Sequence, residues 1–271
     1  MKFLLIISFL LVSIYGFSQA DVIPPLKAKD SFELQTNPVF KKDSLVIIPR
    51  ETKLDSSSFI VNNKIDKKLL NRYKISVFYY SNAKSRYPYY VKQWNAPIVI
   101  YMDKALPKQL RKSVKLFISN FEGIDNLNIT ITKNKNKANY YIKPTDKIFI
   151  NKSYIFENYY EEERFAFNNG DYVILPSENQ QIQGCILELN LNTHLSIDIL
   201  ESNLKQLFFL SLGRFFVIHN DRDVTSYLSP FYEPQNNLSM SDLTMLKIHY
   251  SHIYEFPTTS TEFNNLLKAN Q

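Results

Sequence analysis

The side chains that can bind a metal ion lie toward the C-terminal end of the chain. His219, Asp221 and Asp223 fall within one five-residue stretch, and His249 and His252 are three residues apart. Imidazole and carboxylate groups at these spacings can share one metal ion, zinc above all. The same patterns are also typical of a polar turn closed by aspartate side chains and of histidines that complement a helix dipole. The sequence leaves both interpretations open for each group.

Other reactive groups are few. Cys185 is the only cysteine, so the chain has no internal disulfide, and it lies in the apolar run 184–189, where a buried, inert thiol is expected. The sequence contains no glycine-rich phosphate loop and no Gly-x-Ser-x-Gly motif. We therefore expect no cofactor, and zinc is the alternative that the residues suggest.

The elements that position these groups become regular after residue 90. Apolar side chains recur at helical spacing from Pro107 to about Phe121, and a second helix is expected over Ile197–Gly213. A further helix begins at Ser239–Asp242, a capping box that satisfies free backbone N–H groups. Strands are expected at Ile98–Met102, Asn128–Thr132, Asn139–Lys143, Tyr172–Leu175 and Cys185–Leu189. Upstream, a short helix is expected at Lys64–Tyr73 and a strand at Lys74–Tyr80.

This order predicts an α+β fold. The pattern strand, helix, strand, strand after residue 97 places the first two strands parallel in one sheet. We expect a twisted mixed sheet packed against two long helices, with a C-terminal helix. Residues 71–271 form this domain, and residues 21–70, rich in Pro, Lys, Asp and Ser, are predicted to be an extended arm or linker.

The N-terminus has the pattern of a secretory signal peptide, residues 1–20. Lys2 supplies the positive charge, Phe3–Val12 the apolar run, and Ser18–Ala20 the small residues at the cleavage site. The apolar run is shorter than the about 20 residues of a bilayer span. The sequence therefore predicts an exported protein, periplasmic or extracellular, without a transmembrane segment after cleavage.

Charge and aromatic content indicate which classes of partner to expect. The net charge is +6, but positive and negative residues are mixed, and the basic patches Lys64–Lys68 and Lys133–Lys137 are short enough to be solvated turns. Together with export, this argues against nucleic acid as a partner. The tyrosine-rich segment 79–90 can serve as a carbohydrate-binding surface or as part of the core.

The order of motifs over roughly 94–250 resembles the zincin metalloproteases, especially their matrixin-like members. The motifs are the strand Trp94–Met102, the strand Ala138–Ile142, the strand Gly184–Asn190, the helix ending at Leu212-Gly213, and Leu238–Leu243 leading to Tyr250. The same order resembles an uncharacterised bacterial family, related to zincins, in which the metal motif is degenerate.

A zincin site needs two histidines one helical turn apart and a glutamate beside the first. Setting Gly213 on the family's glycine gives the corresponding positions in this chain. Gln206 and Leu210 replace the two histidines, Leu207 the glutamate, and Phe216 the third ligand. The resemblance thus implies a protease-like fold without the protease chemistry, a pseudoenzyme whose Leu207 and Leu210 belong to the core.

These observations predict a non-catalytic binding or assembly module of the cell envelope with a protein or peptide partner. Active members of the resembled family bind extended peptide on an edge strand, here expected at Gly184–Asn190 beside the loop 214–237. The aromatic residues of this region can serve as anchors for the partner or can pack under the loop; they are Phe215, Phe216, Tyr227, Phe231 and Tyr232. Two alternatives remain: a metal-dependent hydrolase with a displaced site built from His219, Asp221, His249 and His252, and a carbohydrate-binding surface protein.

Overall fold

The structure is a computed structural model. It describes residues 65–78, 89–149, 169–177, 179–193, 195–218, 220–233 and 237–269. The predicted signal peptide, nearly all of the predicted arm, most of the tyrosine-rich segment and His219 lie outside these residues. No helix in the described part of the chain is long and apolar enough to cross a membrane.

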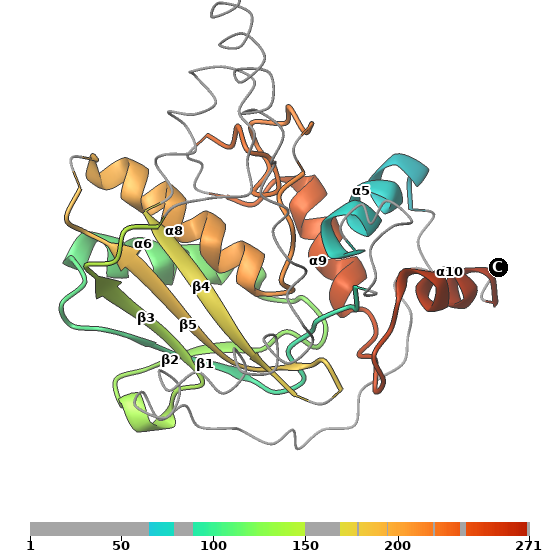
Figure 1. Cartoon of the computed structure of the whole chain (residues 1–271), viewed down its shortest axis with the longest axis horizontal. Helices are drawn as coiled ribbons and strands as arrows, with labels where there is room; N and C mark the ends of the chain where they lie inside the picture. The colour runs from blue at the N-terminus through green and yellow to red at the C-terminus, as the bar shows by residue number, and fades with distance from the viewer. Residues whose placement is uncertain are drawn as a thin grey trace, which may run out of the picture. The chain divides into compact units, whose positions relative to one another are not determined.

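Five strands form one mixed sheet in the order β2-β1-β3-β5-β4 (Figure 1). They are β1 (Ile98–Met102), β2 (Ile129–Thr132), β3 (Tyr140–Thr145), β4 (Gly170–Pro176) and β5 (Ile182–Asn190). Strand β1 is parallel to both β2 and β3, β3 is parallel to β5, and β4 is antiparallel to β5. The α+β class and the parallel first two strands are confirmed.

The structure describes five α-helices, and three of them begin where the sequence predicts a helix, after Pro107, at Ile197 and at Ser239–Asp242. They are α5 (Lys67–Phe78), α6 (Lys108–Ile118), α8 (Ile197–Ser211), α9 (Met240–Tyr250) and α10 (Ser260–Ala269), with short 3-10 turns η1 (Ser119–Phe121) and η2 (Lys135–Lys137). The hydroxyl of Ser196 accepts the backbone N–H of Ile199 at the start of α8. Helices α6 and α8 have 11 and 15 residues, which is an ordinary length for a globular domain.

The predicted strand at 74–80 is wrong, because α5 continues without a break to Phe78. The β-branched and aromatic residues favour a strand locally, but tertiary packing overrides that preference. The rings of Tyr73 and Phe78 lie 5.4 and 5.8 Å from the ring of Phe263 on α10. Helix α10 is not predicted from the sequence, so its effect on α5 is not predicted either. The predicted boundary between arm and domain, 70/71, falls inside α5.

Helices α6 and α8 pack together on one face of the sheet. The ring of Phe117 on α6 lies 6.2 Å from that of Phe208 on α8, and Phe208 lies 5.3 Å from Tyr140 on β3. Tyr140 also stacks on Trp94, and all four side chains are buried. Helices α5, α9 and α10 lie near one another, beyond the C-terminal end of α8 (Figure 1).

The predicted edge strand Gly184–Asn190 is also wrong. Strand β5 lies between β3 and β4, and all but one of its residues are buried. Its continuous apolar run is typical of a strand covered on both faces. The edge strand on this side of the sheet is β4. Its antiparallel pairing with β5 cannot be predicted from the hydrophobic pattern of β4 alone.

Candidate functional site

The candidate site is the loop that joins α8 to α9, together with the helix faces that hold it. On α8, Leu207 and Leu210 are both buried in the core, as predicted. Gln206, at the position of the first zincin histidine, donates from Nε2 to the backbone oxygens of Tyr227 and Ser229, at 3.0 and 3.1 Å. The side chain at that position therefore ties the loop to the helix.

Gly213 follows the C-terminal end of α8, where a glycine commonly adopts a left-handed backbone conformation, but it has a different role here. The residue with a left-handed backbone is Arg214, at φ 50°, while Gly213 itself does not have positive φ. The backbone N–H of Phe215 donates to the carbonyl of Leu210 at 2.9 Å and closes the helix end. A Cβ at Gly213 would lie 2.5 Å from the ring of Phe215 and 2.7 Å from His249. The glycine allows these two rings to approach the backbone.

His249 is fully buried, and both of its ring nitrogens face protein atoms. Nδ1 lies 3.2 Å from the hydroxyl of Tyr73, and Nε2 lies 3.0 Å from the carbonyl oxygen of Lys92. A neutral ring that donates from Nε2 and accepts at Nδ1 satisfies both contacts. Burial lowers the pKa of His249 to about 3, although the Lys92 carbonyl favours the protonated form. Neither nitrogen is left for a metal.

His252 has contacts of its own, separate from those of His249. Its ring packs edge-on against Tyr254, at 4.8 Å between centroids, and its backbone carbonyl accepts a hydrogen bond from Gln93. The described residues contain no group of three or more histidine, cysteine or acidic side chains placed to hold a metal ion.

The low pKa of His249 predicts acid sensitivity. An unfolded histidine has a pKa of about 6.5. Between that value and about 3, the unfolded chain binds a proton that the folded protein does not bind. The free energy of unfolding should therefore fall as the pH falls below about 6.5, by about 1 kcal/mol between pH 7 and pH 5.5. Urea denaturation at the two pH values measures this loss.

The variant His249→Gln should reduce this acid loss, because glutamine does not titrate. His252→Gln is the matched control and should keep the loss. Asp242 has the opposite effect, since burial raises its pKa and stability from that group falls as pH rises. The comparison between variants is therefore the diagnostic quantity. An equal loss in wild type and His249→Gln would contradict the assignment.

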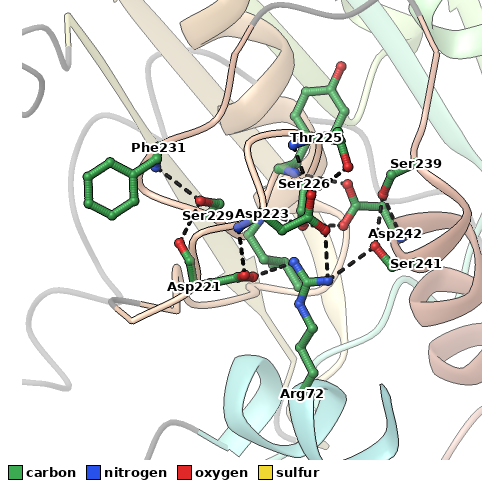
Figure 2. Close-up of polar contacts among 12 residues, drawn as sticks. Arg72, Asp221, Asp223, Thr225, Ser226, Ser229, Phe231, Ser239, Ser241 and Asp242 are labelled. Carbon is green, nitrogen blue, oxygen red and sulfur yellow. Dashed lines mark hydrogen bonds and ion pairs between the residues drawn. The ribbon is translucent and has the colours of Figure 1, made fainter. Parts of the chain in front are cut away.

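Asp221 and Asp223 converge on a cation, but that cation is a side chain of the same protein (Figure 2). The guanidinium of Arg72 on α5 forms ion pairs with Asp221 and, at 3.3 Å, with Asp223. It also donates to the hydroxyl of Ser241 at 3.1 Å. Burial raises the pKa of Asp223, but hydrogen bonds from Thr225 and the charge of Arg72 outweigh it, so that the pKa is lowered. The aspartates thus anchor the loop to α5.

Asp242 is a third carboxylate that holds the loop. The hydroxyl of Ser239 accepts the N–H of Asp242 at 3.1 Å, so half of the predicted capping box is confirmed. The carboxylate instead reaches across to the loop and accepts from the hydroxyl of Ser226 at 2.6 Å and the N–H of Tyr227 at 2.9 Å (Figure 2). Asp242 is fully buried. Burial raises its pKa, although these hydrogen bonds and the charge of Arg72 favour the charged form.

Two of the five predicted aromatic anchors are core residues. Phe215 is stacked on Phe209 at 5.6 Å, and Tyr227 lies between Phe209 and Phe117, at 5.3 and 5.0 Å. Their exposed fractions are 3% and 0%, so neither can contact a partner. These two apolar side chains, which suggested a binding surface, instead fill the space between the loop and α8.

The other three anchors are partly exposed, and each has an aromatic or cationic neighbour. The ring of Phe216 meets Tyr89 edge-on, Phe231 lies under the guanidinium of Arg222 at 4.2 Å, and Tyr232 packs on Tyr227. Phe216, at the position of the third zincin ligand, also donates its backbone N–H to Ser76 on α5. The structure therefore does not gather the five aromatics on one surface.

Sequence reasoning missed Arg72 and Gln93. Gln93 donates from Nε2 to the carbonyls of His249 and His252 and accepts the N–H of Tyr254 at 3.0 Å, so it closes the C-terminal end of α9. No local signal marks either residue, because their partners lie about 150 residues away in sequence. Lys92, beside Gln93, has its pKa lowered to about 8 by burial and by the charge of Arg214.

No family model matches the chain, and no curated protein matches it.

Proposed function

We propose that this chain is an exported, zincin-like protein without catalytic activity, which acts as a binding or assembly module in the cell envelope. The proposal is carried by the residues that occupy the helix positions at which a zincin binds its metal. Gln206 binds loop carbonyls, while Leu207 and Leu210 are buried among core side chains. These groups stabilise the fold and offer no ligand for zinc. Asp221 is paired with Arg72 and His249 is hydrogen-bonded within the protein, which supports the non-catalytic proposal over the displaced metal site.

The zincin-like part of the proposal is supported by the order of elements. A mixed sheet ends in the antiparallel edge strand β4, and α8 packs against that strand and ends at Ser211, two residues before Gly213. The packing is close, since a Cβ at Gly170 of β4 would lie 2.7 Å from a methyl carbon of Leu207. The capped helix α9 follows after the loop.

The partner-binding part is supported by β4. Among the described strands, β4 pairs only with β5, and an unpaired strand edge is the kind of surface to which an extended segment adds as a further strand. Val173 is 43% exposed, and Asp171 is exposed next to it. A charged residue on an edge strand is typical of proteins that avoid unspecific pairing. An added strand must therefore accommodate the charge of Asp171, and the edge of β4 replaces β5 as the expected site.

The test is photocrosslinking from the edge of β4 in the native envelope. A photoreactive amino acid at Val173 should give a discrete product with one envelope protein. Ile131 is the matched control, because it is an exposed apolar residue, 39% accessible, on the opposite edge strand β2. It should give no such product. Equal labelling from both positions, or none from Val173, would argue against strand addition at β4.

Metal analysis of the same purified protein tests the non-catalytic part. We expect no stoichiometric zinc and no cleavage of generic peptide substrates. The hydrolase alternative requires the opposite result: one zinc per chain, removable by a chelator together with a peptidase activity. That result would overturn the proposal, whatever the crosslinking shows.

A further inference from the structure

Helix α6 carries a row of positive charge on the side that faces away from the core. The row consists of Lys108, Arg111, Lys112 and Lys115, which we call the basic face of α6. The spacing of three and four residues places them on one side of the helix. The buried residues of α6, including Leu110, Val114 and Phe117, lie on the opposite side. The three lysines are exposed, and Arg111 is partly exposed.

This face holds most of the net charge of the protein. The chain has a net charge of +6, and the segment 104–121 contains five basic residues and no acidic one, which leaves +1 for the rest. None of the four residues of the basic face forms an ion pair with an acidic side chain in the described part of the chain. Like charges one turn apart destabilise a helix, and Lys108 lies at the N-terminal end, where the dipole disfavours a cation. Such an arrangement is relieved by an external anion.

A groove of about 460 Å³ runs beside the basic face, between α6 and α8. Its wall on α6 includes Gln109, Lys112 and Leu116, and its wall on α8 includes Glu201 and Lys205. Glu201 and Lys205 form an ion pair at 2.7 Å with each other. Leu116 is 63% exposed at the rim. The groove therefore offers an apolar contact and polar groups next to a row of cations.

We propose that the basic face and this groove bind an acidic peptide segment of a partner protein. The basic face extends about 10 Å from Lys108 to Lys115, at 1.5 Å per residue. That length corresponds to about three residues of an extended peptide or two turns of a helix. Acidic side chains of the segment pair with the lysines, and an apolar side chain contacts Leu116 in the groove. This surface is separate from the edge of β4 and does not depend on it.

The geometry favours a peptide over the other anionic surfaces of an envelope. Membrane-surface helices insert an apolar face into lipid. The apolar face of α6 is buried in the protein, with Leu116 as the exposed exception. Sugar binding commonly uses an exposed aromatic ring, but Phe117, the aromatic residue of the groove, is 1% exposed.

The experiment measures binding of a fluorescein-labelled peptide of six glutamates around a central leucine, by fluorescence anisotropy at low and at physiological salt. Wild-type protein should bind, and more weakly at the higher salt, because the contacts are charged. Lys112→Glu with Lys115→Glu should weaken binding at least about tenfold, since it reverses two of the four charges. The same peptide with glutamine in place of glutamate should not bind.

Lys133→Glu with Lys137→Glu is the matched control, because it makes the same change in net charge at two exposed lysines of another basic patch. It should bind the acidic peptide within about twofold of wild type. Thermal unfolding of both variants establishes that they are folded. Equal weakening in the two variants would mean that only overall charge matters and would overturn the proposal. Binding to vesicles with about 30% phosphatidylglycerol but not to the peptide would also overturn it, in favour of a lipid surface.

Discussion

Replacing Leu210 by alanine is expected to lower the free energy of unfolding by about 2–5 kcal/mol, the usual range for emptying a packed site. Leu210 is 7% exposed and belongs to the core between α8 and the rest of the domain. Its backbone carbonyl also accepts the hydrogen bond that closes α8. The loss reflects both the apolar surface removed and the cavity that the rigid surroundings leave. Urea or thermal denaturation measures it.

Leu116→Ala is the matched control for this prediction. It removes the same atoms from a leucine that is 63% exposed, so stability should change by at most about 0.5 kcal/mol. A near-neutral Leu210→Ala would mean that this face of α8 is open, and the assignment of Leu210 to the core would be wrong.

Restoring the zincin motif should destabilise the protein further. The variant Gln206→His, Leu207→Glu, Leu210→His buries a charge and two polar rings, and it removes the hydrogen bonds from Gln206 to the loop. Phe216 leaves the third ligand missing, so no protease activity should appear. Unfolding is measured with and without zinc. Strong stabilisation of this variant by zinc would mean that a metal pocket survives and that α8 is more than a structural element.

Replacing Arg72 by methionine is expected to cost about 2–3 kcal/mol. Removing one partner of a buried ion pair costs about 3–5 kcal/mol, because the remaining charge stays buried. Partial exposure reduces this value, since the side chains of Arg72 and Asp221 are 17% and 14% exposed. The loss should appear in chemical denaturation. Lys68→Met changes an exposed residue of the same helix, so it is the control and should change stability by at most about 0.5 kcal/mol.

A second variant separates the charge of Arg72 from its packing. Adding Asp221→Asn and Asp223→Asn to Arg72→Met removes the unpaired charges, so a substantial part of the lost stability should return. If the combined variant were no more stable than Arg72→Met, the two carboxylates would not be responsible for the loss. Stabilisation of Arg72→Met alone by calcium or zinc would show that the same carboxylates can hold a metal once the arginine is absent.

The sequence predicted the parts of the fold that depend on local patterns. Strand β1 has a short apolar run after a proline, and α8 and α9 each begin at a serine cap, so these elements can be recognised within their own residues. The state of α5 depends on Phe263 of α10, and the order of β4 and β5 depends on strand pairing. Neither dependence is visible in a local window.

In the candidate site, too, contacts between residues far apart in the sequence could not be predicted from local patterns. The sequence left two interpretations open for Asp221 and Asp223, a metal site and a polar turn closed by aspartate side chains. The structure shows the turn, because the backbone N–H of Asp223 donates to Asp221 and that of Thr225 donates to Asp223, and it adds an ion pair with Arg72 that the spacing did not predict. Arg72 is separated from Asp221 by 149 residues, and nothing near it marks it as a partner. For the aromatic residues of the loop, the sequence left surface anchors and packing under the loop both open, because a loop pattern does not reveal which side chains turn inward. Phe215 and Tyr227 are the two that are buried.

The contacts of α5 also determine when it can fold during synthesis. Arg72, Tyr73 and Ser76 bind residues of the loop and of α9, and Tyr73 packs on α10, which ends at Ala269. These partners emerge from the ribosome long after α5, because they lie near the other end of the chain. Helix α5 therefore has no docking site on a nascent chain, and the domain is completed only after nearly all of it has been made. If the protein is exported, as we propose, this late completion favours translocation, since the chain remains unable to finish folding until it has left the ribosome.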